Sequence, residues 1–263
     1  MAGKAVAKTK EAGLPANLEA EMAVDAGDGL QTIRTEDLAV PFLRILQKMS
    51  PQVSKRDGAY IQGAEEGMIM NTVTGEVWDA REGVLVIPCA YNYKYIVWKP
   101  REDGGGLVST HNRDDALPRT EKNERGQDIT DEGNILTPTA EHYVLLIDAD
   151  GRCEQAVIAM SSTQLKNSRK WNSLMAQQTI ATKDGMRPAP IYSRVYSLKT
   201  KVDSNDKGEW NSWDIELDGV LSEKEAYLVA RTFSKAVNAG HVQAKHVSEE
   251  SAAANNAAAE EAM

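Results

Sequence analysis

Three tyrosines alternate along one apolar stretch of the sequence, at Tyr91, Tyr93 and Tyr95. Successive side chains of a β-strand point to opposite faces, so the three rings would share one face at intervals of about 7 Å. Three further candidates follow along the same stretch: Trp98, Lys99 and Arg101. Rings stack on nucleobases while cations contact phosphates, so this pattern is typical of a surface that binds single-stranded nucleic acid. The alternative is a half-buried strand whose tyrosines pack into the core.

A second aromatic and basic cluster lies at alternate positions of a later apolar segment. Its members are Tyr192, Arg194 and Tyr196, with Lys199 and Lys201 further along. We expect Arg194 to share a face with the two tyrosines. A buried face would have to pair that charge, which favours an exposed binding strand over a core strand.

A predicted helix over residues 162–178 adds three cations on one side: Lys166, Arg169 and Lys170. They could contact backbone phosphates, or simply form a solvated face. The surrounding segment 161–202 holds eight basic residues and one acid, a net charge of +7 in a chain whose formal charge is −9.

The sequence lacks the usual marks of an enzyme. It has no His-Glu-x-x-His, no phosphate-binding Gly-x-x-x-x-Gly-Lys loop and no Gly-x-Ser-x-Gly elbow, and its four histidines are scattered. We therefore predict no catalytic site, no metal and no cofactor. A magnesium nuclease using acids of the segment 114–132 is a weaker alternative, because those acids have no strand to hold their geometry. Cys89 and Cys153 are expected to be reduced.

Turn residues between apolar segments predict three hairpins. Their turns lie at Thr74-Gly75, at Asp150-Gly151 and over residues 203–208. The strongest strand signal covers residues 83–100. Pro88 should break it, bulge it or place it at a sheet edge, since proline donates no hydrogen bond to a ladder.

Capping-box spacings at residues 161–164 and 222–225 predict the starts of two helices, the second of which should end at Gly240. Several hairpins with helices between them predict an α+β fold that is mainly β. We expect an OB-like (oligonucleotide-binding-like) small barrel or an open antiparallel sheet with two or three attached helices.

Composition divides the chain into three parts. Residues 1–30 (net −2) and residues 247–263 (net −4) have few large apolar side chains and are expected to be disordered tails. The core, residues 31–246, is expected to form one β-rich unit. Within it, the polar segment 102–137 shows no periodicity and is expected to be a long mobile loop. No apolar run could serve as a signal peptide or a membrane span, so we expect a cytoplasmic protein that binds no membrane.

The chain resembles a family of tailed-bacteriophage proteins over roughly residues 38–240. The likeness rests on PFLRILQKMSP, NTVTGEVWD, WKPREDGGGLV, SSTQLKNSRKWNSLM and WNSWDIELDG. More loosely, its layout is similar to that of phage single-stranded-DNA-binding proteins, which have an OB-fold and protect DNA during replication and recombination. The chain departs from them by ending AEEAM, without their C-terminal aromatic residue.

These observations predict a phage protein that coats single-stranded DNA in the cytoplasm of the host cell. The acidic tail is expected to recruit phage replication or recombination proteins, although the missing aromatic residue weakens that expectation. The alternative is a structural or assembly protein of the virion without nucleic-acid binding. The sequence leaves the oligomeric state open.

Overall fold

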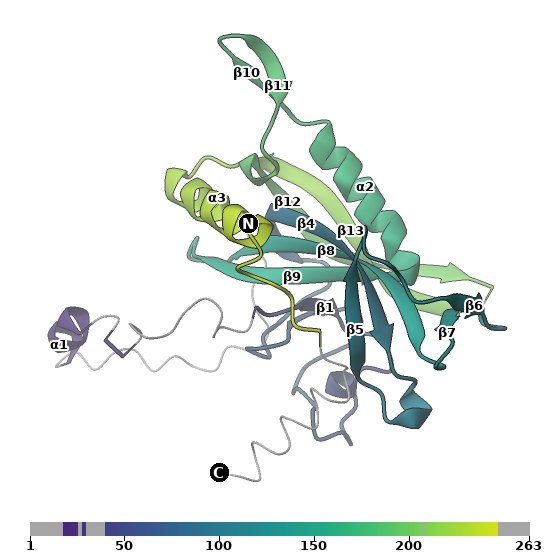
Figure 1. Cartoon of the computed structure of the whole chain (residues 1–263). Coiled ribbons are helices and arrows are strands. Elements are labelled where there is room, and N and C mark those ends of the chain that lie inside the picture. The colour runs from purple at the N-terminus through teal and green to yellow at the C-terminus, as the bar shows by residue number, and fades with distance from the viewer. Residues whose placement is uncertain (1–17, 26–27, 30–39, 207, 247–263) are drawn as a thin grey trace.

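A computed structural model of the chain describes residues 18–25, 28–29, 40–206 and 208–246. Its largest sheet within these residues has eight strands in the order β13-β12-β4-β8-β7-β6, with β5 added to β4 and β9 to β8 (Figure 1). All its pairings are antiparallel, and the sheet curls into a half-barrel. The predicted mainly β fold is therefore confirmed, in its open-sheet form.

The centre of this sheet is the pairing of two long strands, β4 (Val84–Trp98) and β8 (Ile135–Ile147). They pair along almost their whole length, with an irregularity between Pro88 and Ala90. Of the break, bulge or edge position predicted from Pro88, the structure shows a bulge-like shift of register. β9 (Cys153–Ser161) returns from β8 through the predicted turn at Asp150-Gly151.

A long hairpin and a small separate sheet complete the framework. β12 (Arg194–Asn205) and β13 (Gly208–Val220) form the long hairpin predicted at residues 203–208. A separate sheet consists of β1 (Leu43–Ile45), β2 (Ile69–Asn71) and β3 (Val77–Trp78). The turn predicted at Thr74-Gly75 joins β2 to β3 and is confirmed.

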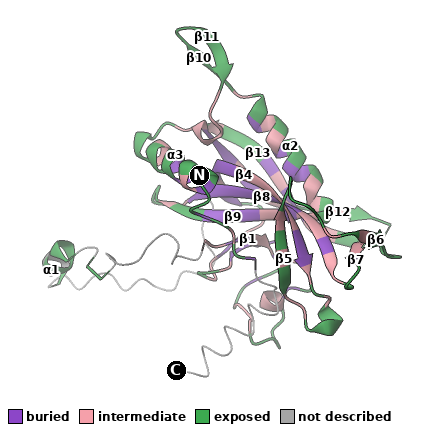
Figure 2. Ribbon diagram, in the orientation of Figure 1, coloured by how far each residue is buried: buried purple, intermediate pink, exposed green. Residues whose placement is uncertain are grey.

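One helix covers each face of the half-barrel. α2 (Leu165–Ala176) buries Trp171 and Met175 in one core cluster, and α3 (Lys224–Asn238) buries Phe233 and Val237 in another. Burying such large side chains contributes about 1.5–3 kcal/mol each. β8 supplies alternate side chains to both clusters, which explains the continuous apolar run over its residues 143–147. In Figure 2 the buried colour accordingly follows the central strands.

The capping boxes predicted for both helices are absent. Neither the residue before α3 nor the one before the 3₁₀ turn η4 (Ser162–Gln164) makes a side-chain capping bond. α2 begins at Leu165, directly after η4, and the Gln164 side chain bonds to β13. Gly240, with a φ of +78°, follows the end of α3 as predicted.

The segment 102–137 is not the structureless loop that the sequence predicts. It contains β5 (Leu107–Asn112), β6 (Thr120–Lys122) and β7 (Asp128–Thr130). β5 extends the sheet along residues 94–98 of β4 and is mostly exposed. Backbone hydrogen bonds hold these short strands with little apolar burial, so they leave no hydrophobic periodicity in the sequence.

A second segment between the predicted elements forms a small hairpin. β10 (Thr179–Thr182) and β11 (Gly185–Pro188) follow α2 and project from the body of the molecule (Figure 1). Of the predicted tails, residues 247–263 lie outside the described part of the chain, and residues 1–30 are described only around the short helix α1 (Glu19–Val24). No helix in the described residues is long and apolar enough to cross a membrane.

The turn before β4 approaches β12 closely at Gly83. Its φ is +66°, and a Cβ atom there would overlap the carbonyl oxygen of Leu198. We expect Gly83→Ala to lower the free energy of unfolding by about 3 kcal/mol or more, because backbone strain and steric overlap add. Urea denaturation followed by circular dichroism measures the loss.

Gly75→Ala is the matched control. Gly75 has a similar φ of +69°, but nothing lies within 4 Å of the added atom. This variant should lose only about 1 kcal/mol. Equal losses in the two variants would contradict the close approach of residue 83 to β12.

Candidate nucleic-acid interface

An open cleft lies beside the middle of β4. On the side away from β8, β12 pairs with residues 84–86 and β5 with residues 94–98. Among the described residues, no strand pairs with the stretch between them on that side. The cleft has a volume of about 400 Å³. It is lined by residues 91–94 of β4, by residues 112–114 at and after the end of β5, and by five residues at and after the end of α3: Val237, Asn238, Gly240, Val242 and Gln243.

The three tyrosines of β4 line one side of this strand, toward α2. All three are half-buried, and Tyr91 and Tyr93 pack against the core cluster beneath α2. Tyr91 tilts against the ring of His142 at a centroid distance of 5.0 Å, and Tyr93 meets Tyr95 edge to face at 5.5 Å. Tyr91, Tyr93 and Tyr95 thus form a tyrosine ladder. Its inner end rests on the core, and each ring keeps part of its surface exposed.

Arg113 completes this group, and the sequence did not reveal it. Its guanidinium lies over the Tyr93 ring, with Cζ 4.2 Å from the ring centroid. Burial and the neighbouring Tyr95 raise the pKa of the Tyr93 phenol, although the positive charges of Arg113 and Arg169 oppose this rise. The ring is therefore neutral at physiological pH. Only the pairing of Lys94 with Asn112 across β4 and β5 brings Arg113 here, and that register has no signal in the sequence.

The remaining β4 candidates lie elsewhere. Trp98 alternates to the opposite face, where its ring meets that of His246 edge to face at 6.3 Å. Lys99 and Arg101 are exposed after the end of the strand. Of the predicted helix cations, Arg169 lies close enough to affect the Tyr93 phenol, and Lys170 is exposed beside it.

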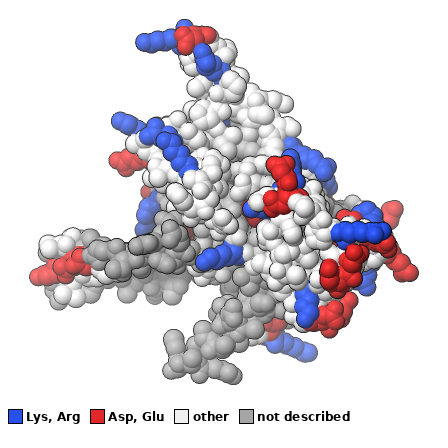
Figure 3. Space-filling model, viewed as in Figure 1, with Lys and Arg blue, Asp and Glu red and all other residues white. Residues whose placement is uncertain are grey.

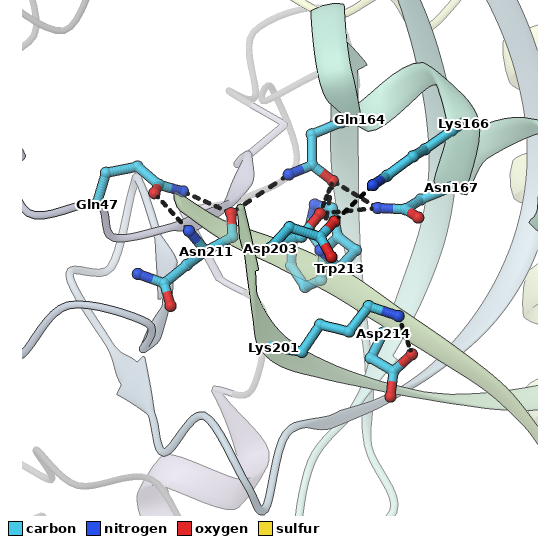
Figure 4. Close-up of polar contacts among 10 residues, drawn as sticks. Gln47, Gln164, Lys166, Asn167, Lys201, Asp203, Asn211, Trp213 and Asp214 are labelled. Atoms are coloured by element: carbon cyan, nitrogen blue, oxygen red, sulfur yellow. Dashed lines mark hydrogen bonds and ion pairs between the residues drawn. The ribbon is translucent and has the colours of Figure 1, made fainter. Parts of the chain in front are cut away.

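Two predicted cations are paired with carboxylates. Lys166 Nζ lies 2.8 Å from Asp203 Oδ2, and Lys201 Nζ lies 2.9 Å from Asp214 Oδ1 (Figure 4). Such exposed pairs contribute at most about 1 kcal/mol, but each reduces the net positive charge around its lysine. The net charge of +7 in segment 161–202 therefore does not form a single basic surface.

The side chains of Gln164 and Gln47 both bond to the backbone of β13. The Gln47 side chain donates to the carbonyl oxygen of Asn211 and accepts from its N–H, both at 2.9 Å (Figure 4). Gln164 donates to the same oxygen at 3.3 Å and accepts from Trp213 N at 3.3 Å. The two amides thus provide hydrogen-bond partners for backbone groups at the outer edge of β13. They also connect this edge to α2 and to the small sheet.

The second predicted cluster does not form a binding face. Tyr192 lies in the 3₁₀ turn η5 (Ile191–Ser193) before β12, so strand alternation does not reach it, and it packs on Tyr227 of α3. Tyr196 is fully buried beneath α2, in the core cluster against which Tyr91 and Tyr93 pack, 5.8 Å from the ring of Trp171. The prediction that Tyr196 stacks on bases is therefore wrong. Lys199 is half-buried beside Gly83.

Arg194 is buried as well, so its predicted contact with phosphate is wrong. Its guanidinium donates to Gln178 Oε1 at 3.1 Å, to the Thr179 carbonyl oxygen at 3.0 Å and to both oxygens of Ser193 at 3.2 Å. These acceptors belong to the segments on either side of β10 and β11. Arg194 therefore anchors the base of the projecting hairpin, satisfying the charge by hydrogen bonds that no sequence pattern announces.

A further cluster of titratable side chains joins β8 to the segment after α3. Glu141 and His246 are buried together, with Oε1 and Nε2 2.6 Å apart, and Tyr143 donates to the second carboxylate oxygen. This group ties the segment after α3 to β8. Within the described residues, no three histidine, cysteine or acidic side chains are arranged to hold a metal ion.

Comparison with known proteins identifies one family. The family model described as Pam3 phage gp34-like protein matches residues 8–243. No curated protein and no solved structure matches the chain. The predicted resemblance to phage proteins is confirmed at the level of this family, whereas the likeness in layout to single-stranded-DNA-binding proteins stays a prediction.

Burial of His142, which packs against Tyr91, should make the free energy of unfolding depend on pH. His142 is buried against Trp171 with a ring distance of 4.5 Å, and burial lowers the pKa of its imidazole from 6.5 to about 3. Between these values the unfolded chain binds one more proton than the folded protein. The free energy of unfolding should therefore fall as pH drops below about 6.5, by up to about 1.4 kcal/mol per pH unit from this group.

The comparison that isolates this residue is His142→Gln, since other titrating groups contribute equally to both proteins. Chemical denaturation between about pH 6 and pH 4 should give a smaller pH slope for the variant than for the unsubstituted protein. Identical slopes would mean that His142 is protonated in the fold.

Proposed function

The chain belongs to the Pam3 phage gp34-like family, and we propose that it binds single-stranded DNA along the tyrosine side of β4 and coats it during replication or recombination. The observation that carries this proposal is the group formed by Tyr93, Tyr95 and Arg113 beside the open cleft. It combines aromatic rings with a cation in direct contact, which is the chemistry that unpaired bases and their phosphates require.

The rings supply the attraction that does not depend on base identity. Each base stacked on an aromatic side chain is worth about 1–3 kcal/mol. A base could stack on the paired guanidinium and phenol, or replace the guanidinium, which would then turn to a phosphate. Tyr91 and Tyr93 are already packed against the core, and Tyr95 packs against Tyr93, so little side-chain entropy is lost on binding.

The phosphates are assigned to the α2 side of the ladder. Arg169 and Lys170 are exposed there, and neither forms an ion pair with another described residue. Toward the end of α3 the cleft also contains Asp114, which repels phosphates. A strand that crosses the tyrosines toward α2 avoids that acid. The net charge of −9 makes this local contact more important than attraction by the whole protein.

The direct test is the affinity of the full chain for an unstructured oligonucleotide, measured by fluorescence quenching at several salt concentrations. Tyr93→Ala should weaken binding by roughly 5- to 150-fold, the equivalent of one lost stacking contact. Arg113→Ala should also weaken it and reduce the slope of log affinity against log salt by roughly 0.7.

Tyr60→Ala and Arg81→Ala are matched controls, because they remove the same side-chain types elsewhere on the protein. Both should bind like the unsubstituted chain. An absence of binding at low salt would overturn the proposal. If the protein also copurified with intact phage particles, a role in virion assembly would take its place.

A further inference from the structure

The β10–β11 hairpin is a surface without a partner in the described structure. All of its strand residues are exposed, as the uniform colour of the hairpin in Figure 2 shows. Cross-strand pairing places Ala181 opposite Met186 and Thr179 opposite Pro188, so one face is largely apolar. Met186 is 66% exposed. An isolated two-stranded hairpin is only marginally stable in water, so contact with another surface would stabilise this one.

The hairpin is nevertheless held in a fixed direction. Arg194 bonds to the Thr179 carbonyl oxygen and to Gln178 at its base, and the Gln178 carbonyl oxygen accepts from Ala189 N at 2.8 Å. Gln178 Nε2 in turn donates to Leu174 O in α2 at 3.0 Å. A projecting element that is anchored in this way loses little entropy when it docks.

A complementary surface lies at the outer edge of β13, the end strand of the half-barrel. The side chains of Gln47 and Gln164 occupy this edge only as far as Trp213. Beyond it, the described residues provide no main-chain partner for residues 215–220 on that side. Leu217 is 43% exposed and Val220 68% exposed, so this edge also presents apolar surface.

The charges of the two surfaces are opposite. Asp184 on the hairpin pairs with Arg187 at 3.5 Å, which leaves Lys183 as its excess positive charge, and Figure 3 shows basic and acidic side chains at the tip of the hairpin. The β13 edge instead exposes Glu216 and Asp218. Two β13 edges would repel each other, whereas the edge attracts the hairpin.

We propose that the β10–β11 hairpin of one copy of this chain docks on residues 215–220 of β13 in a second copy. The hairpin and the edge are neighbours in each copy, because Arg194, which anchors the hairpin, pairs with Val220. A two-fold arrangement therefore allows both contacts to form at once, which closes the assembly as a dimer. This interaction is separate from the proposed DNA contact on β4.

The test is a charge exchange in the full chain without DNA. One variant carries Lys183→Glu and Arg187→Glu, and the other carries Glu216→Lys and Asp218→Lys. In each variant alone, the hairpin and the edge have the same sign, so dimerisation measured by sedimentation velocity should weaken by at least about tenfold. An equal mixture of the two should dimerise again, since both contacts in the mixed pair join opposite charges.

Lys55→Glu with Arg81→Glu is the matched control. Both residues are exposed and far from the hairpin in the sequence, and the change in net charge is the same as in the hairpin variant. This control should dimerise like the unsubstituted chain, and circular dichroism should show that every variant is folded. A monomeric unsubstituted chain, a hairpin variant that still dimerises, or a mixture that does not associate would overturn the proposal.

Discussion

The bulge between Pro88 and Ala90 determines which side chains of β4 reach the candidate interface. Before it, Val84 and Val86 face the core cluster beneath α2; after it, Tyr91 and Tyr93 do. The two valines have even numbers and the two tyrosines odd numbers, and side chains alternate between the faces of a regular strand. A strand without the irregularity would therefore turn the tyrosines toward α3. Proline at position 88 donates no hydrogen bond to the ladder, which favours the irregularity at this place. The tyrosine ladder, its support by His142 and its contact with Arg113 all depend on this local change of register.

A second constraint fixes the surroundings of the ladder. The amides of Gln47 and Gln164 act as short substitutes for a neighbouring strand at Asn211, and they join the small sheet, α2 and β13. Gln164 also accepts from Asn167 Nδ2 at 2.9 Å, which fixes the first turn of α2. The position of α2, and with it the distance of Arg169 from the tyrosines, therefore depends on buried polar contacts as well as on apolar packing.

Much of the framework could be predicted because its signals are local. Apolar alternation and turn residues identified the hairpins at Thr74-Gly75 and Asp150-Gly151, and α2 lies within the helix predicted over residues 162–178. The site could be predicted only in part. The tyrosines of β4 are a local pattern, whereas Arg113 reaches Tyr93 through pairing between strands that sequence periodicity does not reveal.

The wrong predictions also arise from contacts between segments that are distant in the sequence. Arg194 and Tyr196 look like members of a basic and aromatic surface, but the partners that bury them come from distant segments: the end of α2 for the arginine, and Trp171 for the tyrosine. Burial of a charged residue depends on partners in three dimensions, which composition cannot reveal. The same holds for Lys166 and Lys201, whose carboxylate partners lie on β12 and β13.

The central claim is that single-stranded DNA lies across the tyrosines of β4, and photo-crosslinking tests it most directly. An oligonucleotide containing 5-iodouracil would be irradiated with the full chain, and the crosslinked peptides identified by mass spectrometry. The account predicts crosslinks at Tyr93 and Tyr95 that disappear at high salt. Crosslinks confined to other faces, or none under conditions where the oligonucleotide is bound, would contradict it.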